Sequence, residues 1–148
     1  AKYDEVCKYY PFTPVSDTEI YKEKVERWVS NYESGSYFHW VIEWKETGDL
    51  VGTINLGNVE ESCLMSDTCY MLSPKFWNRG IMTEVLNAVL DYAFNDIKLK
   101  KIRAIVFSNN ERSMHLVEKV GFKKTSIVEN VKTVDGASVS EVNFILER

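Results

Sequence analysis

Residues 77–83, Trp-Asn-Arg-Gly-Ile-Met-Thr, could hold a phosphate group. An apolar strand is predicted to end at Leu72, and a long helix is predicted to begin at about Gly80. The first turn of a helix carries backbone N–H groups without internal partners, and the helix dipole adds roughly half a positive charge. Arg79 would add charge and the Thr83 hydroxyl a further hydrogen bond, so this helix start could bind phosphate oxygens. Gly80 either lets a ligand approach the backbone or only permits tight packing.

A second polar cluster, residues 108–113, follows another predicted strand and opens a shorter helix. Ser108 and Glu111 have the spacing of a capping box, and the pair Asn109 and Asn110 is equally suited to an N-cap. The Ser113 hydroxyl could bond to the helix backbone, face solvent or face a ligand. Capping accounts for these residues as structure, but it does not explain why a strand, a polar cluster and a helix occur twice in this order.

The two segments WNRGIMTEVLNAVLDYAF and NNERSMHLVEKVGF together resemble the GCN5-related N-acetyltransferases (GNAT), specifically the RimJ/RimL-type branch. That branch reads Trp-Gly-x-Gly-x-(Ala/Met)-Thr-Glu in the first segment and Asn-x-x-Ser…Glu-Lys-x-Gly-Phe in the second. The resemblance runs from residue 18 to residue 148, with Asn78 where Gly is usual. The family's opening strand has no counterpart here. We therefore expect one GNAT acetyltransferase domain over residues 1–148 that lacks the family's first strand.

The resemblance implies a site for acetyl-CoA as the acyl donor. The pantetheine arm would lie along the strand end at residues 70–72, and the pyrophosphate on the amides of residues 78–83. Asn110 would hold the pantetheine side, and Ser113 would approach the thioester sulfur. The coenzyme-binding residues so implied are Tyr70, Met71, Leu72, Asn78, Arg79, Gly80, Ile81, Met82, Thr83, Asn110 and Ser113.

Acetyl transfer to an amine requires a neutral amine, a stabilised oxyanion and a leaving thiolate, ideally with a proton. Ser113 is the candidate for the proton to sulfur. Asp67, where the branch often has Glu, is the candidate base, although it could equally be a surface carboxylate. Glu129 and Glu141 are further carboxylates to test. Some relatives, notably polyamine acetyltransferases, carry a Tyr acid at the position of Val117, so a polyamine acceptor is less favoured.

The acceptor is expected to be the N-terminal α-amine of a protein or peptide, which attacks acetyl-CoA directly without an acyl-enzyme. An α-amine has a pKa near 7.7–8.0 and a lysine near 10.4, so deprotonating lysine costs roughly 3.5 kcal/mol more. The alternatives are a small amine (an amino acid, a polyamine or an antibiotic) or a non-catalytic acyl-CoA-binding module. We expect a cytoplasmic monomer or homodimer without nucleic-acid or membrane partners. The basic run 98–103 is expected to be a solvated loop and strand edge.

An α+β fold must position these residues: a three-layer, mostly antiparallel mixed sheet, splayed at its centre as in the resembled family and flanked by helices. A helix with one apolar stripe precedes it, and a hairpin turn is expected at residues 45–49. The helix over 81–94 is apolar on more than one side and should be buried. Strands are predicted at residues 37–44, 50–56, 62–72, 101–107, 122–128 and 140–146, and the second short helix at 110–120.

Composition narrows the remaining possibilities. The 148 residues carry a net charge of −4, so a general polyanion-binding surface is not expected. The three cysteines show no CxxC spacing and the two histidines lie far apart, so no metal site is expected. A reducing compartment fits an odd number of cysteines. Cys63 and Cys69 are expected as buried thiols on one strand face, with a catalytic nucleophile as the alternative.

Overall fold

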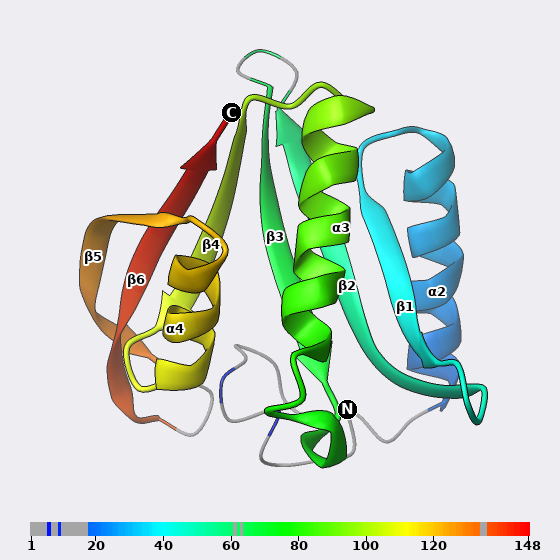
Figure 1. Ribbon diagram of the computed structural model, residues 1–148, viewed down its shortest axis with the longest axis horizontal. Coiled ribbons are helices and arrows are strands. Elements are labelled where there is room, and N and C mark those ends of the chain that lie inside the picture. Colours follow the sequence, from blue (N-terminus) through cyan, green and yellow to red (C-terminus); the bar gives the residue numbers. More distant parts are fainter. Residues whose placement is uncertain (1–5, 7–8, 10–17, 61, 63, 134–135) are drawn as a thin grey trace.

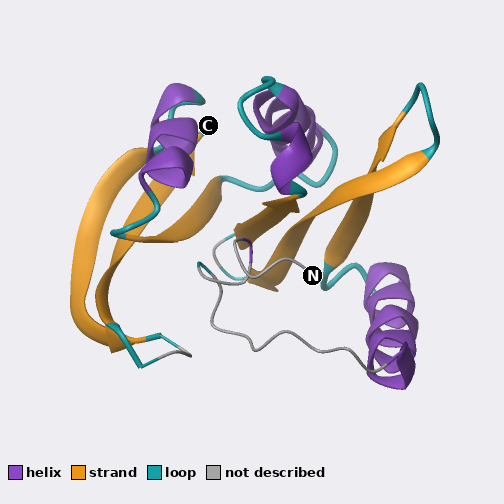
Figure 2. Ribbon diagram, turned by 90° about the horizontal axis from the view of Figure 1, so that it is seen from below, coloured by secondary structure: helices purple, strands orange, loops and turns teal. Residues whose placement is uncertain are grey.

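The computed structural model describes residues 6, 9, 18–60, 62, 64–133 and 136–148. A six-stranded sheet has the order β1-β2-β3-β4-β6-β5. Helices α3 and α4 cover one face of the sheet and α2 lies on the other (Figure 2). The elements are α2 (Thr18–Glu33), β1 (Phe38–Trp44), β2 (Asp49–Glu60), β3 (Met65–Leu72), the 3₁₀ turn η1 (Pro74–Phe76), α3 (Ile81–Asn95), β4 (Lys101–Phe107), α4 (Glu111–Lys119), β5 (Lys123–Lys132) and β6 (Ser138–Glu147).

The sheet splits at its centre. β3 and β4 pair in parallel only from Met65↔Lys101 to Thr68↔Ala104, and all other neighbouring strands are antiparallel. Beyond this point β3 continues along β2 as far as Leu72, while β4 continues along β6. The two strands therefore diverge, and in Figure 1 they lie together at the top and apart below. The predicted mixed sheet with a central splay is confirmed.

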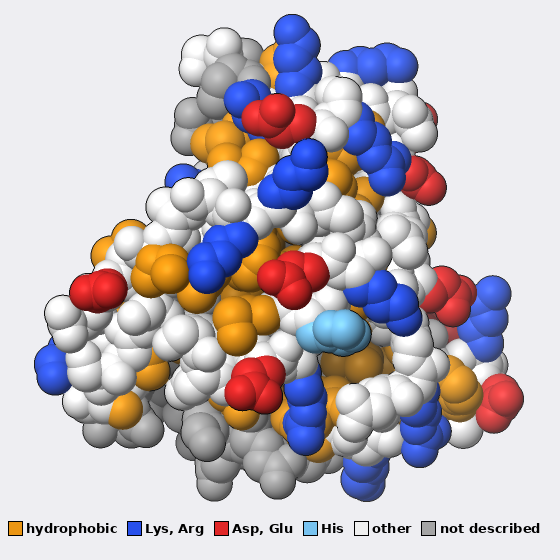
Figure 3. All heavy atoms as spheres, turned by 60° about the vertical axis from the view of Figure 1, so that its left-hand side comes forward, with side chains coloured by type: hydrophobic (Ala, Val, Ile, Leu, Met, Phe, Trp, Pro, Cys, Tyr) orange, Lys and Arg blue, Asp and Glu red, His pale blue; other side chains and the backbone are white. Residues whose placement is uncertain are grey.

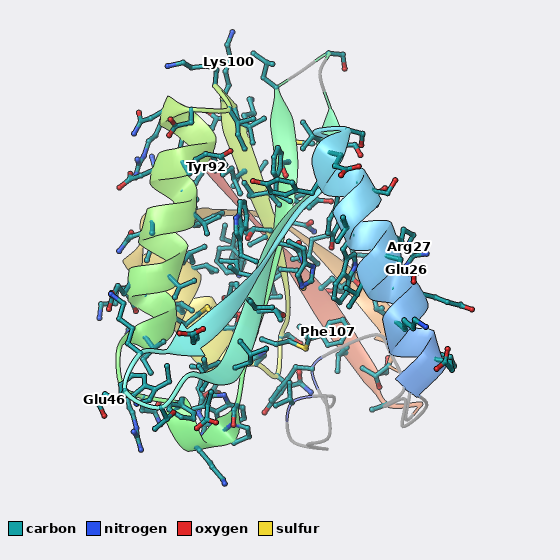
Figure 4. The ribbon with its side chains drawn as sticks, turned by 90° about the vertical axis from the view of Figure 1, so that its right-hand side faces the viewer. Glu26, Arg27, Glu46, Tyr92, Lys100 and Phe107 are labelled. Atoms are coloured by element: carbon teal, nitrogen blue, oxygen red, sulfur yellow. The ribbon has the colours of Figure 1, made fainter. Side chains whose placement is uncertain are left out.

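Helix α3 fills the space over the splayed sheet. Leu86, Leu90 and Ala93 are fully buried in the main core cluster. The Tyr92 ring, labelled in Figure 4, meets the Phe38 and Trp40 rings edge-on, at centroid distances of 6.2 and 5.9 Å. Truncating a buried leucine such as Leu86 to alanine costs about 2–5 kcal/mol. The predicted burial holds for this one face only, because Glu84, Asn87 and Asp91 on the other face are exposed.

The apolar stripe of α2 is largely exposed. Ile20, Val25 and Val29 are 40%, 48% and 56% exposed. Two aromatic residues of the stripe contact the sheet: the Trp28 ring stacks on His39 at 3.9 Å, and the Tyr32 ring meets Phe38 edge-on at 5.5 Å. The stripe correctly indicated a helix, but within the described residues it is not a core face.

Several predicted details were wrong. β2 continues past Leu56 to Glu60, because pairing with β3 resumes beyond a bulge. Gly57 lies in this added part of the strand, where an added Cβ would come 2.5 Å from the Tyr37 ring. The next strand begins at Met65 and not at Ser62, and Cys69 on it is exposed and not buried. Cys63 lies outside the described residues.

No helix in the part of the chain that the structure describes is long and apolar enough to cross a membrane. The same residues contain no group of three His, Cys, Asp or Glu side chains able to hold a metal ion. Figure 3 shows basic, acidic and apolar side chains mixed across one face of the molecule. Two members of the basic run 98–103 form ion pairs, Lys101 with Glu147 and Arg103 with Asp67, both at 2.7 Å.

Candidate active site

A cavity of about 790 Å³ lies at the splay. Its walls are the diverging ends of β3 and β4, the loop that precedes α3, and the first turns of α3 and α4. A volume of this size is typical of small-molecule sites. The structure brings every predicted site residue to this cavity: Asp67, Tyr70, Met71, Leu72, Asn78, Arg79, Gly80, Ile81, Met82, Thr83, Asn110 and Ser113 all line it.

Side chains from both faces of the sheet line this cavity. Successive residues of a strand point to opposite faces. Tyr70 points toward the helices, since its hydroxyl reaches Ser113 on α4. Asp67 and Cys69 therefore point to the opposite face, on which α2 lies. We call the face that carries Tyr70 the α3 side of the cavity and the face that carries Asp67 the α2 side. Residues from both faces line the cavity.

The start of α3 is shaped by two residues with left-handed backbones. Gly80 is the N-cap, with φ 78°, and Asn78 has φ 59°. A Cβ built on Gly80 would meet nothing within 4 Å of the described chain. The tight-packing interpretation of Gly80 is therefore wrong, and the glycine serves the backbone conformation. Asn tolerates the left-handed region better than most residues, which accounts for Asn78 where Gly is usual.

Aromatic and basic side chains fix the loop next to this helix start. The Trp77 Nε1–H donates to the Leu72 carbonyl at 2.8 Å, which ties the loop to the end of β3. The Arg112 guanidinium lies over the Trp77 ring at 4.8 Å, and that of Arg79 over the Phe76 ring at 5.4 Å. The two guanidinium groups are thus held on the loop that leads into α3, whose first turn has no side-chain cap on its backbone N–H groups. Sequence reasoning missed Arg112, because nothing in its spacing distinguishes it from a solvated charge in a helix.

The first turn of α4 has one of the two caps that the sequence predicted. The Asn110 Oδ1 accepts the backbone N–H of Ser113 at 3.2 Å, so Asn110 is the N-cap. Ser108 does not cap the helix; its Oγ accepts the backbone N–H of Ser140 at 3.2 Å. The capping box of Ser108 with Glu111 was therefore wrong. Because the cap uses the side chain of Asn110 and the backbone of Ser113, the Ser113 hydroxyl remains available to the cavity.

Tyr70 and Ser113 form a hydroxyl pair on the α3 side. Their oxygens lie 2.7 Å apart. Burial raises the pKa of Tyr70 to about 12, against the opposing effect of the Ser113 hydrogen bond. The phenol is therefore protonated throughout the neutral range. Only the backbone of Tyr70 had been expected to act, because a tyrosine in an apolar strand gives no signal of a distant partner.

Asp67 is held on both of its oxygens. The Arg103 Nε donates to Oδ1 at 2.7 Å, the Arg103 Nη2 to Oδ2 at 2.9 Å, and the Asn58 Nδ2 to Oδ2 at 3.0 Å. This charge-assisted pair joins β3 to β4 just before they diverge. The geometry favours a structural role for Asp67 over that of the base. Of the other two carboxylates, Glu141 lines the cavity, whereas Glu129 is exposed and lies outside its lining.

A family comparison decides the chemistry of this site. The acetyltransferase (GNAT) domain family model matches residues 1–123. The chain belongs to this family. It is accordingly an acetyl-CoA-dependent acetyltransferase.

Individual relatives agree with this assignment. The chain is 29% identical over 133 residues to the uncharacterized N-acetyltransferase YoaA of Bacillus subtilis, covering 90% of this chain and 75% of YoaA. Its fold matches that of Mycobacterium smegmatis RimJ in complex with CoA-disulfide, with TM-score 0.85, 23% identity, and coverage of 97% and 70% of the two chains. It also matches Vibrio cholerae spermidine N-acetyltransferase in complex with CoA and spermine (TM-score 0.84, 19% identity, 97% and 82% covered). The predicted resemblance to the RimJ/RimL branch is confirmed.

Proposed function

We propose that this GNAT enzyme acetylates the N-terminal α-amine of a protein or peptide, with the amine attacking acetyl-CoA directly. The observation that carries this proposal is the charge of the cavity. Asp67 and Glu141 are the carboxylates among the described lining residues, and Arg103 already neutralises Asp67. One uncompensated carboxylate suits an acceptor with a single positive charge. A polyamine, such as the spermine bound to the V. cholerae relative, would present several charges to it.

The geometry supports a donor site on the α3 side. The open N–H groups at Gly80 and the guanidinium groups of Arg79 and Arg112 suit the negative charge of a pyrophosphate. The pantetheine arm would run along the end of β3 at residues 70–72, where pairing with β4 has stopped. Acetyl-CoA supplies an activated acyl group there. The chain's own residues bind the coenzyme, exclude water and orient the two reactants.

The role of Ser113 follows from a comparison of pKa values. A thiol has a pKa near 8.5, so moving a proton from Tyr70, with a pKa of about 12, to a thiolate would be uphill by about 5 kcal/mol. Tyr70 is thus a poor source of the proton that sulfur finally takes. Ser113 is better suited to donate a hydrogen bond to the leaving sulfur, with its hydroxyl oriented by Tyr70.

The size of the deprotonation cost favours an α-amine over lysine. At neutral pH an α-amine is partly neutral, whereas lysine requires roughly 3.5 kcal/mol more to lose its proton. A cavity with one available carboxylate is therefore better suited to deprotonating an α-amine than a lysine.

An amine panel with acetyl-CoA and a thiol-release assay tests the proposal. The panel contains a peptide with a free N-terminus, the same peptide with a blocked N-terminus and one lysine, spermidine, and an aminoglycoside. We expect turnover with the free N-terminus and little with the blocked lysine peptide. Faster turnover of spermidine or the aminoglycoside would reject the α-amine and support a small-amine acceptor.

A cysteine variant tests direct attack. Cys69 is exposed at the cavity on the α2 side, so an acyl-enzyme could form on its thiol. Cys69→Ala should keep its turnover. Loss of turnover in Cys69→Ala, together with trapping of an acetylated Cys69 by mass spectrometry, would show that the attack is not direct.

A further inference from the structure

We infer that Glu141 is the carboxylate that takes the proton from the acceptor amine, an inference that rests on the proposed function. It differs from the role given to Asp67 on sequence grounds. Four observations carry it: the position of Glu141 in the sheet, its half-buried carboxylate at the cavity, the absence of a described partner for that carboxylate, and the engagement of Asp67 elsewhere.

The strand register brings Glu141 to the α2 side. Glu141 on β6 lies directly opposite Phe107 on β4 (labelled in Figure 4) in an antiparallel pair. Residues directly opposite in such a pair share a face of the sheet. Phe107 shares its face with Arg103, four residues earlier on the same strand, and Arg103 bonds to Asp67 on the α2 side. Glu141 therefore projects on the face opposite to Ser113 and Tyr70.

Glu141 also lies at the level of the Tyr70–Ser113 pair along the strands. Tyr70 comes two residues after Thr68, the last β3 residue paired to β4. Phe107, opposite Glu141, comes three residues after Ala104, the last paired residue of β4. At about 3.3 Å per residue, the two levels differ by about one residue. An amine that enters from the α2 side would thus meet Glu141 on one side and the donor's thioester on the other.

The surroundings leave Glu141 available as a base. No described residue forms an ion pair with it or donates a hydrogen bond to its carboxylate, whereas Asp67 accepts three such bonds. Glu141 is half-buried and lines the cavity. The other titratable or charged side chains of the lining are Tyr9, Asp67, Cys69, Tyr70, Arg79, Arg112, His115 and Lys119.

The proton balance of the step is simple. The ammonium group of the acceptor gives one proton to the Glu141 carboxylate, which leaves a neutral nitrogen. The nitrogen attacks the thioester carbon, so that a C–N bond forms and the C–S bond breaks. The second nitrogen proton goes to the departing sulfur, and Glu141 releases its proton to solvent.

A pair of isosteric variants tests this role. Glu141→Gln should lower kcat/KM by about 10²- to 10⁴-fold and leave CoA affinity and the melting temperature unchanged. Glu141→Asp, which keeps a carboxylate, should recover part of the activity. Glu129→Gln is the matched control, because Glu129 is an exposed carboxylate outside the cavity lining. It should behave as the wild type.

The outcomes separate this inference from the proposed function. If the wild type acetylates peptides and Glu141→Gln does so at the same rate, Glu141 is not the base and the proposed function stands. If the wild type acts on no peptide, the proposed function fails. Glu141 is then judged by calorimetry with the free-amine peptide and CoA. Weaker binding of the peptide to Glu141→Gln than to the wild type would support Glu141 as the carboxylate that contacts the amine. Equal binding would overturn the inference.

Discussion

Arg103 holds Asp67 by two hydrogen bonds of 2.7 and 2.9 Å, one residue pair before β3 and β4 part. The two residues face each other in the parallel register, so the ion pair acts across the last paired segment of the splayed strands. The charge pair therefore ties β3 to β4 at the point where the sheet opens. It lies at the edge of the cavity, which Asp67 itself lines.

Asp67→Asn should lower stability and largely preserve turnover. Loss of the charge-assisted bonds at this partly exposed pair is expected to lower the free energy of unfolding by about 1–2 kcal/mol. Urea unfolding and thiol release measure the two effects. Asp91→Asn is the matched control, because its ion pair with Arg148 is more exposed and should matter less. A collapse of kcat at unchanged stability would return Asp67 to the role of base.

Removing the Ser113 hydroxyl should affect turnover more than binding. Ser113→Ala is expected to lower kcat about tenfold, the equivalent of one hydrogen bond of about 1.4 kcal/mol to the leaving sulfur, with CoA affinity unchanged. Tyr70→Phe keeps the ring and leaves Ser113 without its partner at 2.7 Å, so it should lower kcat by a smaller factor. Stopped-flow thiol release and calorimetry measure rate and affinity. Wild-type kinetics in both variants would limit the pair to packing.

Charge at Gly80 should control coenzyme binding. Asp and Asn have nearly the same size and both tolerate a left-handed backbone, and the described space around Gly80 is open. Gly80→Asp places a negative charge on the site proposed for pyrophosphate, so the Kd for CoA should rise about 10²-fold. Gly80→Asn is the control and should bind nearly as the wild type. Equal affinities of Asp and Asn variants by calorimetry would reject the phosphate site.

Stability should fall as the solution becomes mildly acidic, because of His39. Its ring stacks between Trp28 and Tyr37, both ring nitrogens are buried without a described partner, and burial lowers its pKa. The unfolded chain binds a proton at His39 near pH 6.5, whereas the folded chain binds it only at lower pH. The contribution of neutral His39 is therefore intact above about pH 6.5 and lost as the pH falls toward the lower folded value.

His39→Phe keeps an aromatic ring in the stack and cannot titrate. The free energy of unfolding in urea should change less for this variant than for the wild type between pH 7.5 and about 5.5, because the variant lacks the group whose pKa differs between the folded and unfolded chains. His115→Gln removes an exposed histidine and should keep the wild-type slope. Parallel slopes in the wild type and His39→Phe would show that His39 titrates alike in both states.

Elements with strong local signals were predictable from the sequence. Gly48 and Asp49 marked a tight turn between two aliphatic and aromatic runs, and the hairpin β1–β2 lies there. The apolar residues around Leu86 and Leu90 indicated a central helix, and one face of this helix is buried. In the site, the order of the two motifs located the cavity lining, because each motif is contained in one strand, one loop and one helix start.

Contacts across the sheet left no such signal. The bond between Tyr70 and Ser113 joins residues 43 apart in sequence, and that between Asp67 and Arg103 joins residues 36 apart. The register that brings Glu141 to the α2 side depends on a third strand. Cys69 was expected to be buried because its strand is apolar, but the loss of the neighbouring strand at the splay exposes it. Contacts between residues far apart in the sequence depend on which strands pair and in what register, and the types of the two residues do not reveal this.

A cavity lined from both faces of a sheet has a consequence for the kinetics of the enzyme. If the donor binds on the α3 side and the acceptor arrives from the α2 side, neither has to leave before the other enters. Initial-rate lines should then intersect in a double-reciprocal plot and not run parallel. Free CoA should compete with acetyl-CoA and act as a non-competitive inhibitor against the amine, so the split in the sheet sets the inhibition pattern of its product.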